Sequence, residues 1–159
     1  MTSDHPLLAM LIRHEGQVTL KGVHVPYDDK TGARFDSGDT LVGKLTVGIG
    51  RNLSDVGLSD DEAMLLLTND VEKVRRELTH ALPYWLTLNE ARQAVLLSMA
   101  FNMGTAGLLK FKQTLGHVER GEYVQAGDAM LDSTWARQVG PRATELADMM
   151  RSGKWPLGG

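Results

Sequence analysis

The distribution of turn-forming residues divides this sequence into two parts, and this division constrains the fold more than any other feature. Residues 17–57 are rich in Gly, Asp, Thr and Val, with turns such as Ser37-Gly38-Asp39. This texture is typical of short strands joined by loops. Most of the remaining sequence has apolar residues at helical spacing. The sequence therefore predicts an α+β fold, with a small antiparallel β lobe over about 17–57 and a larger helical lobe over about 80–159.

Two capping signatures mark the helices that we expect to join the lobes and to fill the helical one. Ser59 and Glu62 have the spacing of a capping box, and helical periodicity continues to about residue 78. This pattern predicts a long interdomain helix over about 59–78. A second box, from Thr87 to Glu90, opens an apolar helix that we expect at the centre of the helical lobe.

A short amphipathic helix is expected over residues 6–15, and we group it with the helical lobe. Leu7, Leu11 and Glu15 are spaced by four and share one face, and Gly16 follows as a terminator. A carboxylate therefore ends an apolar stripe. A desolvated carboxylic acid can donate a proton in catalysis, but position in the helix alone favours a glutamate that faces solvent.

The composition excludes several kinds of chemistry. The 159 residues include no cysteine, which rules out disulfides, thiolate metal sites and a cysteine nucleophile. The five histidines lack metal-ligand spacing, and Gly48-Ile49-Gly50 lacks the third glycine of a dinucleotide loop. The net charge of −3 gives no electrostatic basis for nucleic-acid binding. We expect no metal, no cofactor and no nucleic-acid partner.

The apolar segments are short. None approaches the ~18 residues of a membrane span, and the first residues lack the basic region and apolar core of a signal peptide. We therefore expect a monomer without a membrane anchor that is synthesised in the cytoplasm.

Acid chemistry is the class that remains. Asp28, Asp29, Asp36 and Asp39 precede an alternating segment that contains Thr46. Aspartates in turns usually hold backbone bends, and a threonine in a strand is usually an ordinary β-former. The residues alone are thus compatible with a two-carboxylate hydrolase but do not require one.

Several collinear motifs resemble those of the bacteriophage lysozymes of the T-even type, the family-24 glycoside hydrolases. A helix-ending Glu-Gly is followed by Tyr-x-Asp and by a Gly-x-x-Thr-x-Gly-x-Gly hairpin, and later stretches are similar to the family's interdomain helix and helical lobe. The matching stretches are residues 13–16, 27–29, 43–52, 58–63, 69–71, 101–104, 134–143 and 152–155. The resemblance implies one lysozyme-like catalytic domain over residues 1–159.

The resemblance also implies an activity. Such a muramidase cleaves the β-1,4 bond between N-acetylmuramic acid and N-acetylglucosamine in a peptidoglycan glycan strand. By motif position, Glu15 is the proton donor, Asp29 the second carboxylate, and Thr46 the hydroxyl that helps to hold the attacking water. A single displacement with inversion is implied, with the carboxyl groups about 6.5–9.5 Å apart.

Four further residues are expected to support this site. Phe101 and Thr114 match positions that line the family's saccharide cleft between the lobes, although Phe101 is equally compatible with a partly core-facing position. Asn52 is expected either to contact saccharide or to finish the hairpin. Arg142 matches an arginine that pairs with the catalytic glutamate.

The sequence departs from the family between Tyr-x-Asp and the hairpin. Residues 33–41 are extra and contain Asp36 and Asp39. Asp29 keeps the Tyr-x-Asp context, so it is favoured as the second carboxylate over Asp39, with Asp28 third. The segment has few large apolar residues, and we expect an exposed loop at the cleft rim.

The implied biological role is that of an endolysin. Such an enzyme is made in the host cytoplasm and acts on periplasmic peptidoglycan after a partner permeabilises the membrane. Two alternatives stay open from sequence: a lytic transglycosylase, which uses one glutamate, and a catalytically inactive wall-binding or tail structural protein of the same fold.

Overall fold

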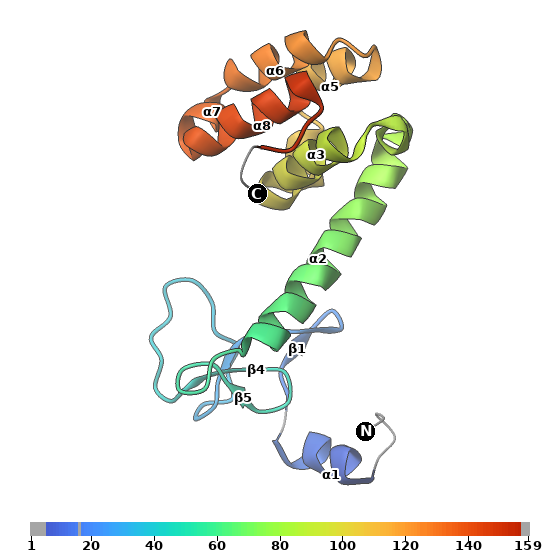
Figure 1. The fold of residues 1–159 in the computed structure, drawn as a ribbon. Coiled ribbons are helices and arrows are strands. Elements are labelled where there is room, and N and C mark those ends of the chain that lie inside the picture. The colour runs from blue at the N-terminus through green and yellow to red at the C-terminus, as the bar shows by residue number, and fades with distance from the viewer. Residues whose placement is uncertain (1–5, 16, 157–159) are drawn as a thin grey trace. The chain divides into compact units, whose positions relative to one another are not determined.

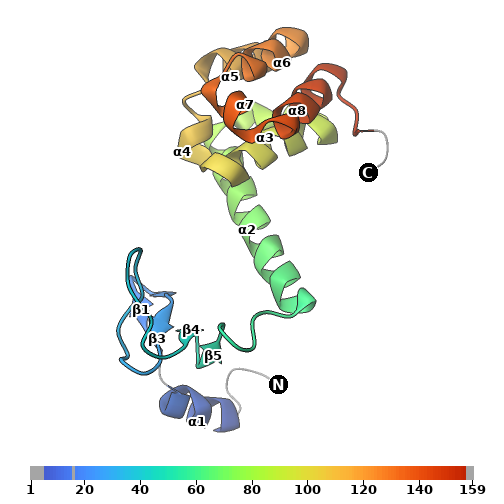
Figure 2. The same ribbon diagram turned by 90° about the vertical axis from the view of Figure 1, so that its left-hand side faces the viewer.

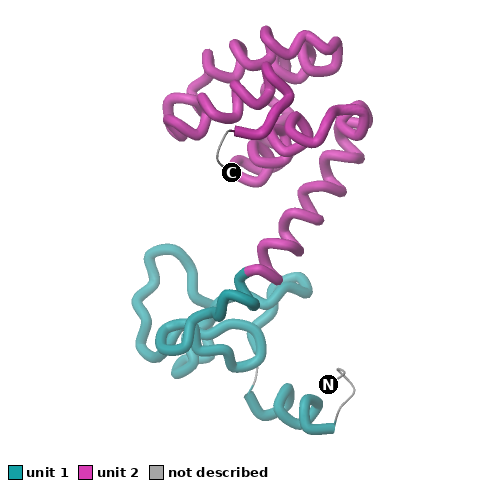
Figure 3. The backbone as a smooth tube through the Cα atoms, viewed as in Figure 1, with its two compact units in different colours: residues 1–63 teal, residues 64–159 magenta. Residues whose placement is uncertain are grey.

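The computed structural model describes residues 6–15 and 17–156, and its helices and short antiparallel strands confirm the α+β class (Figure 1). The chain forms two compact units, residues 1–63 and residues 64–159 (Figure 3). The first contains the strands and the second is helical, as the division of the sequence predicts. The grouping of helix 6–15 with the helical lobe, and of both lobes in one domain, stays a prediction.

The described residues of unit 1 form a short helix and two small sheets before α2 begins. Its elements are α1 (Pro6–Glu15), β1 (Thr19–Leu20), β2 (Val23–His24), β3 (Tyr27–Asp28), β4 (Leu45–Val47) and β5 (Arg51–Asn52). The first two strands form an antiparallel hairpin, and the other three form an antiparallel sheet in the order β3-β4-β5. Gly16, the expected terminator of α1, lies outside the described residues.

The register of the three-stranded sheet aligns three side chains in one row. Tyr27 pairs with Thr46, and Thr46 pairs with Asn52 on its other side. Residues paired across antiparallel strands present their side chains on the same face. Tyr27 and Thr46 are buried and Asn52 is half-buried. This row places Thr46 at the middle of the sheet.

The extra segment of residues 33–41 is exposed apart from half-buried Phe35, as expected. It is not simply a loop, however, because its first residues pair with the strand before it. The Phe35 amide donates to Pro26 O at 3.0 Å, and the Asp28 amide donates to Ala33 O at 2.9 Å. The sequence did not predict this pairing, since ladder hydrogen bonds depend on partners distant in sequence rather than on local apolar content.

α2 (Asp60–Ala81) begins at the predicted capping box and passes from unit 1 into unit 2. The Ser59 amide donates to Glu62 Oε2 at 2.8 Å, and the Glu62 amide donates to Ser59 Oγ at 3.3 Å. The helix continues past the expected end at residue 78, because residues 79–81 contain no helix breaker and Pro83 is the first residue that stops it.

Unit 2 consists of helices that pack around one core. They are η1 (Pro83–Thr87), α3 (Glu90–Met103), α4 (Thr105–Leu108), α5 (Lys112–Glu119), α6 (Tyr123–Leu131), α7 (Thr134–Val139) and α8 (Pro141–Ser152). α8 packs against α3, α6 and α7, and α5 packs against α6 (Figure 2). The expected capping box at Thr87 is wrong: Asn89 caps α3 by accepting from the Arg92 amide, while Thr87 donates to Tyr84 O.

The core of unit 2 is apolar, and the indole N–H that it buries has a hydrogen-bond partner. The indole nitrogen of Trp85 donates to Gln93 O at 3.1 Å, so this large side chain can be buried at little polar cost. Large side chains that are almost inaccessible come from α2, η1, α3, α6 and α8: Leu78, Trp85, Leu96, Met99, Met130 and Met150. α3 therefore lies at the centre of this unit, as its sequence predicts.

The sequence predicts no membrane-spanning segment. None of the described helices combines the length and the apolar character that crossing a bilayer requires.

Leu78 connects α2 to the core of unit 2 and offers a test of the fold. It is fully inaccessible and is the one buried residue of α2. Leu78→Ala should lower the free energy of unfolding by about 2–5 kcal/mol, because it removes buried methyl groups and leaves a cavity. Urea denaturation measures this loss. Leu86→Ala is the matched control: Leu86 is 54% exposed, and its change should stay within about 0.5 kcal/mol. Equal effects would contradict this account of the core.

Candidate active site

Glu15 is placed by contact between the end of α1 and the turn that joins β4 to β5. Gly48 and Gly50 in this turn have φ values of +65° and +70°. A Cβ atom on Gly50 would lie 2.9 Å from Glu15 Oε2 and 3.0 Å from Glu15 Cβ. Position 50 therefore needs glycine for its backbone conformation and for the space that Glu15 occupies.

An apolar recess of about 490 Å³ adjoins Glu15 and is lined by Leu8, Leu11, Ile12 and Ile49. The Glu15 side chain is exposed, and α1 has no buried residue. The helix thus presents its carboxylate at an apolar surface without enclosing it. This exposure agrees with the expectation from position at the helix end, which favours a glutamate that faces solvent. It agrees less well with the expectation from the apolar stripe, which favours a desolvated one.

Asp28 is buried, and its carboxylate accepts hydrogen bonds from backbone amides just before and just after the extra segment. It accepts hydrogen bonds from Lys30 at 2.9 Å, Thr31 at 3.2 Å, Val42 at 2.5 Å and Gly43 at 3.0 Å. The amide bonds, those from Gly43 and Val42 foremost, lower the pKa of Asp28 to about 2. This carboxylate has a structural role that uses its acceptor capacity, which argues against Asp28 as the second catalytic group.

Asp29 is exposed, and its carboxylate binds the amide of the residue after Gly43. Its Oδ1 accepts from the Lys44 amide at 2.7 Å, and its own amide donates to Lys44 O at 3.1 Å. A Cβ on Gly43 would collide with Asp29 Oδ1 and would lie 2.9 Å from Asp28 Oδ1. Glycine at position 43 therefore lets the backbone of residues 42–44 approach both carboxylates at once.

Asp36 and Asp39 hold their own turn within the extra segment. Asp39 Oδ2 accepts from the Asp36 amide at 2.7 Å, and Asp36 pairs with Arg34 at 2.5 Å. These contacts are the ordinary use of aspartate in a turn. Of the four aspartates considered, Asp29 combines exposure with anchorage at the start of β4.

Thr46 and Asn52 lie in the sheet row described above, but both already have partners. Thr46 Oγ1 donates to Lys44 O at 3.3 Å. The amide side chain of Asn52 donates to Asp55 Oδ2 at 2.9 Å and accepts from the Asp55 amide at 3.0 Å. The Asn52 side chain thus holds the turn after β5, and its expected contact with saccharide stays a prediction.

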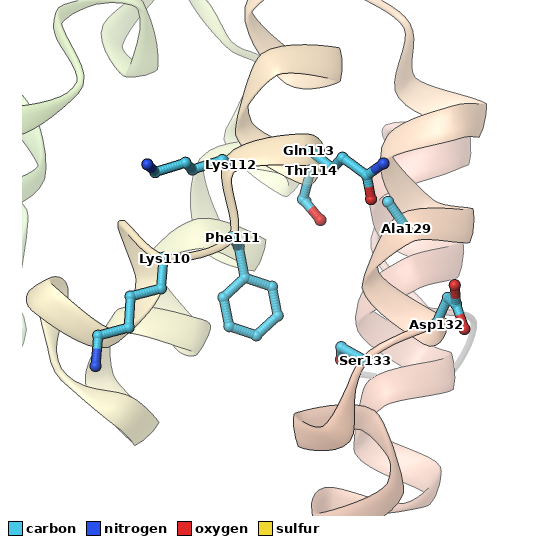
Figure 4. A pocket seen from close by; sticks show the side chains of 8 residues that line it. All are labelled: Lys110, Phe111, Lys112, Gln113, Thr114, Ala129, Asp132 and Ser133. Carbon is cyan, nitrogen blue, oxygen red and sulfur yellow. The ribbon is translucent and has the colours of Figure 1, made fainter.

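Phe101 and Thr114 belong to unit 2 and line different cavities. Phe101 is 42% exposed on α3 and borders a cavity of about 310 Å³ together with Lys73 and Glu77 of α2. Thr114 is buried on α5, and its side chain points into a cavity of about 400 Å³ beside Phe111 (Figure 4). The structure does not bring these two expected saccharide contacts into one pocket.

Arg142, at the start of α8, donates to Ser98 of α3. Its Nη2 lies 2.9 Å from Ser98 Oγ and 3.4 Å from Ser98 O. Glu15 and Arg142 belong to different units, so the expected pair between them stays a prediction.

Two features of the site were not predicted from the sequence. The amides of residues 42–44 bind both Asp28 and Asp29, and Lys44 forms an ion pair with Asp55 at 2.9 Å. The available signal was Gly43 directly before the alternating strand, since an isolated glycine there indicates a close backbone approach. Nothing local distinguishes which carboxylate the amides bind.

Comparison with known proteins gives a consistent family. Residues 28–151 match the sequence profile of the phage lysozyme family, a segment that includes Asp28, Asp29 and Thr46 but begins after Glu15. The pre-baseplate central spike protein Gp5 of Enterobacteria phage T4 is 32% identical over 96 residues, which are 58% of this chain and 17% of that protein. The probable T4-type lysozymes 1 and 2 of Dictyostelium discoideum are each 29% identical over 66 residues, 42% of this chain.

These relatives are longer than the aligned parts. The match covers 39% of each Dictyostelium protein and a smaller share of the spike protein.

The role assigned to Asp28 can be tested by Asp28→Asn. The amide retains one acceptor oxygen but loses the charge, so hydrogen exchange at the Val42 and Gly43 amides should become faster by about tenfold or more. Asp36→Asn is the control, because Asp36 contacts Arg34 and not residues 42–43. Unchanged protection in Asp28→Asn would overturn the assignment.

The wild-type protein should show the same effect with pH. The pKa of Asp28 is lowered from 3.8 to about 2 in the fold. Its contribution is therefore complete above pH ~4 and is lost as the pH falls through about 2. The protection of these two amides, measured as their exchange rate relative to the intrinsic rate at each pH, should fall in that window.

Proposed function

We propose that this chain, which belongs to the phage lysozyme family, hydrolyses the β-1,4 bond between N-acetylmuramic acid and N-acetylglucosamine in peptidoglycan. The observation that carries the proposal is the arrangement within unit 1, where Glu15 lies against the Gly50 turn and Asp29 is anchored to the first residue before β4. Family membership by itself supports a peptidoglycan-hydrolase-like function.

In the proposed reaction Glu15 is the general acid. Its protonated form donates to the glycosidic oxygen as the bond breaks, which avoids expulsion of an alkoxide. The adjacent apolar recess supports this role, because an apolar recess beside a polar group is typical of a ligand site. Gly50 supports it sterically by leaving room for the acid.

Asp29 is the proposed base. It accepts a proton from the water that attacks the anomeric carbon, and an inverting displacement follows. Exposure supports this assignment, since the carboxylate can reach water, whereas Asp28 is engaged by four amides. Thr46 Oγ1 already donates to Lys44 O, so it would accept a hydrogen bond from the same water.

Residues of both units are proposed to complete the site. Asn52, Phe101 and Thr114 are the proposed saccharide contacts, and Arg142 is the proposed support for Glu15. The reaction needs no metal or cofactor. As an endolysin, the enzyme would be made in the host cytoplasm and would reach periplasmic peptidoglycan through a permeabilised membrane.

The match to the Gp5 spike protein favours a second candidate function. More than half of this chain aligns with part of a protein whose name places it in a pre-baseplate. The second candidate is therefore a lysozyme-like domain of a phage tail assembly, in which the wall-binding surface is retained whether or not the acid is used.

Glu15→Gln tests the proposed activity. It should lower the rate of clearing of outer-membrane-permeabilised cells by at least about 10²-fold, because the amide cannot donate the required proton. The melting temperature should not change, since the Glu15 side chain is exposed and the substitution keeps its size. Glu145→Gln is the control, because it makes the same change at an exposed position of α8. This variant should clear cells normally.

The products of the wild-type reaction separate the alternatives. Hydrolysis yields a reducing muramic acid end, and a lytic transglycosylase would yield a 1,6-anhydro end. Wild-type protein that binds peptidoglycan without cleaving it would support the structural alternative and contradict the proposed activity.

A series of three variants tests the second carboxylate. Asp29→Asn should lower the clearing rate by at least about 10²-fold, whereas Asp39→Asn should lower it less than about threefold, because Asp39 serves only its local turn. Asp28→Asn is the structural comparison and should lose amide protection at residues 42–43, which Asp29→Asn should retain. An inactive Asp39→Asn beside an active Asp29→Asn would reassign the role to the extra segment.

A further inference from the structure

A connected set of polar contacts joins Asp29 to Asn52 within unit 1. The Lys44 amide donates to Asp29 Oδ1 at 2.7 Å, and the Lys44 ammonium donates to Asp55 Oδ1 at 2.9 Å. Asp55 Oδ2 in turn accepts from Asn52 Nδ2 at 2.9 Å. One residue, Lys44, therefore contacts Asp29 through its backbone and Asp55 through its side chain.

We propose that Lys44 is a positioning residue for Asp29. Its ion pair with Asp55 fixes the backbone whose amide holds the Asp29 carboxylate, and its ammonium places a positive charge near that carboxylate. The inference rests on the proposed function, in which Asp29 accepts a proton from the attacking water.

The shape of the backbone explains why position 44 is suited to this role. A side chain at position 43 would collide with Asp29, so Gly43 approaches the carboxylates through its backbone alone. Position 44 is the first after Gly43 that carries a side chain. Its ammonium reaches Asp55, which lies in the turn that follows β5.

The charge on Lys44 is maintained by its surroundings. The hydrogen bond and the charge of Asp55 raise the pKa of Lys44, and the charge of Asp29 acts in the same direction. Lys44 therefore stays protonated throughout the pH range of the reaction. The charges of both carboxylates therefore favour the ammonium form of Lys44.

The ion pair is poorly suited to a purely stabilising role. The side chains of Lys44 and Asp55 are 51% and 52% exposed, and exposed ion pairs contribute little to stability because water screens them. Removal of the Lys44 ammonium should therefore leave the fold intact. An effect on turnover would then report on Asp29 and not on unfolding.

Steady-state kinetics on purified, soluble peptidoglycan strands test the inference. Lys44→Met should lower kcat by about tenfold or more with KM within about twofold, because the base is misplaced while saccharide binding is retained. Lys44→Arg should restore kcat to within about threefold, since a guanidinium can pair with Asp55. Lys30→Met is the matched control: this exposed lysine follows Asp29 directly, and its loss changes the charge equally.

A double variant separates this inference from the proposed function. If Lys44 acts through Asp29, adding Lys44→Met to Asp29→Asn should cause no further loss of kcat. Independent losses of kcat that multiply in the double variant would overturn the positioning role.

The single variants separate the two claims. An unchanged kcat in Lys44→Met beside an inactive Asp29→Asn would overturn the inference alone, whereas an active Asp29→Asn would overturn the assignment of Asp29 as the base. Equal losses in Lys44→Met and Lys30→Met would show a general charge effect and also overturn the inference.

Discussion

The geometry of the β-rich unit depends on one buried charge, the carboxylate of Asp28. Burial of an ion is costly unless hydrogen bonds replace its water, and here four backbone amides do so. Two of these amides, those of Lys30 and Thr31, precede the extra segment, and two, those of Val42 and Gly43, follow it. The same contacts therefore close the insertion and bring residue 44 to the position from which its amide holds Asp29.

Two adjacent aspartates consequently have different tasks. Successive side chains of a strand point to opposite faces, so Asp28 is buried opposite the row of Tyr27 and Thr46, while Asp29 is exposed. The buried group is fully bonded and strongly ionised, which suits a structural anchor. The exposed group has one strong amide contact and access to water, which suits a base. Glu15 is held differently, by the shape of the glycine turn beside which its side chain lies.

The sequence predicted most of the helical architecture because helices follow local rules. The capping box at Ser59 opens α2, and the apolar helix expected from about residue 90 forms as α3. Contacts between distant residues could not be predicted in the same way. The pairing of Phe35 with Pro26 and the amides that bind Asp28 depend on a turn geometry that no periodicity records. Adjacent, chemically identical aspartates were ranked by motif alone, and only the register of β3 separates them physically.

The family profile begins at residue 28 and does not include Glu15, although it includes the turn at Gly50 against which Glu15 lies. Within unit 1 the carboxylate is placed by the turn at Gly50 and by an apolar recess to which α1 contributes half-buried side chains. A helix of ten residues without a buried side chain gains little from its own packing. The helical core of unit 2, in contrast, buries large residues such as Leu78 and Trp85. Stability and the proposed proton donation therefore depend on different parts of this chain: core substitutions should weaken folding first, whereas substitutions at Gly50 should displace the Glu15 carboxylate while the helical core remains folded.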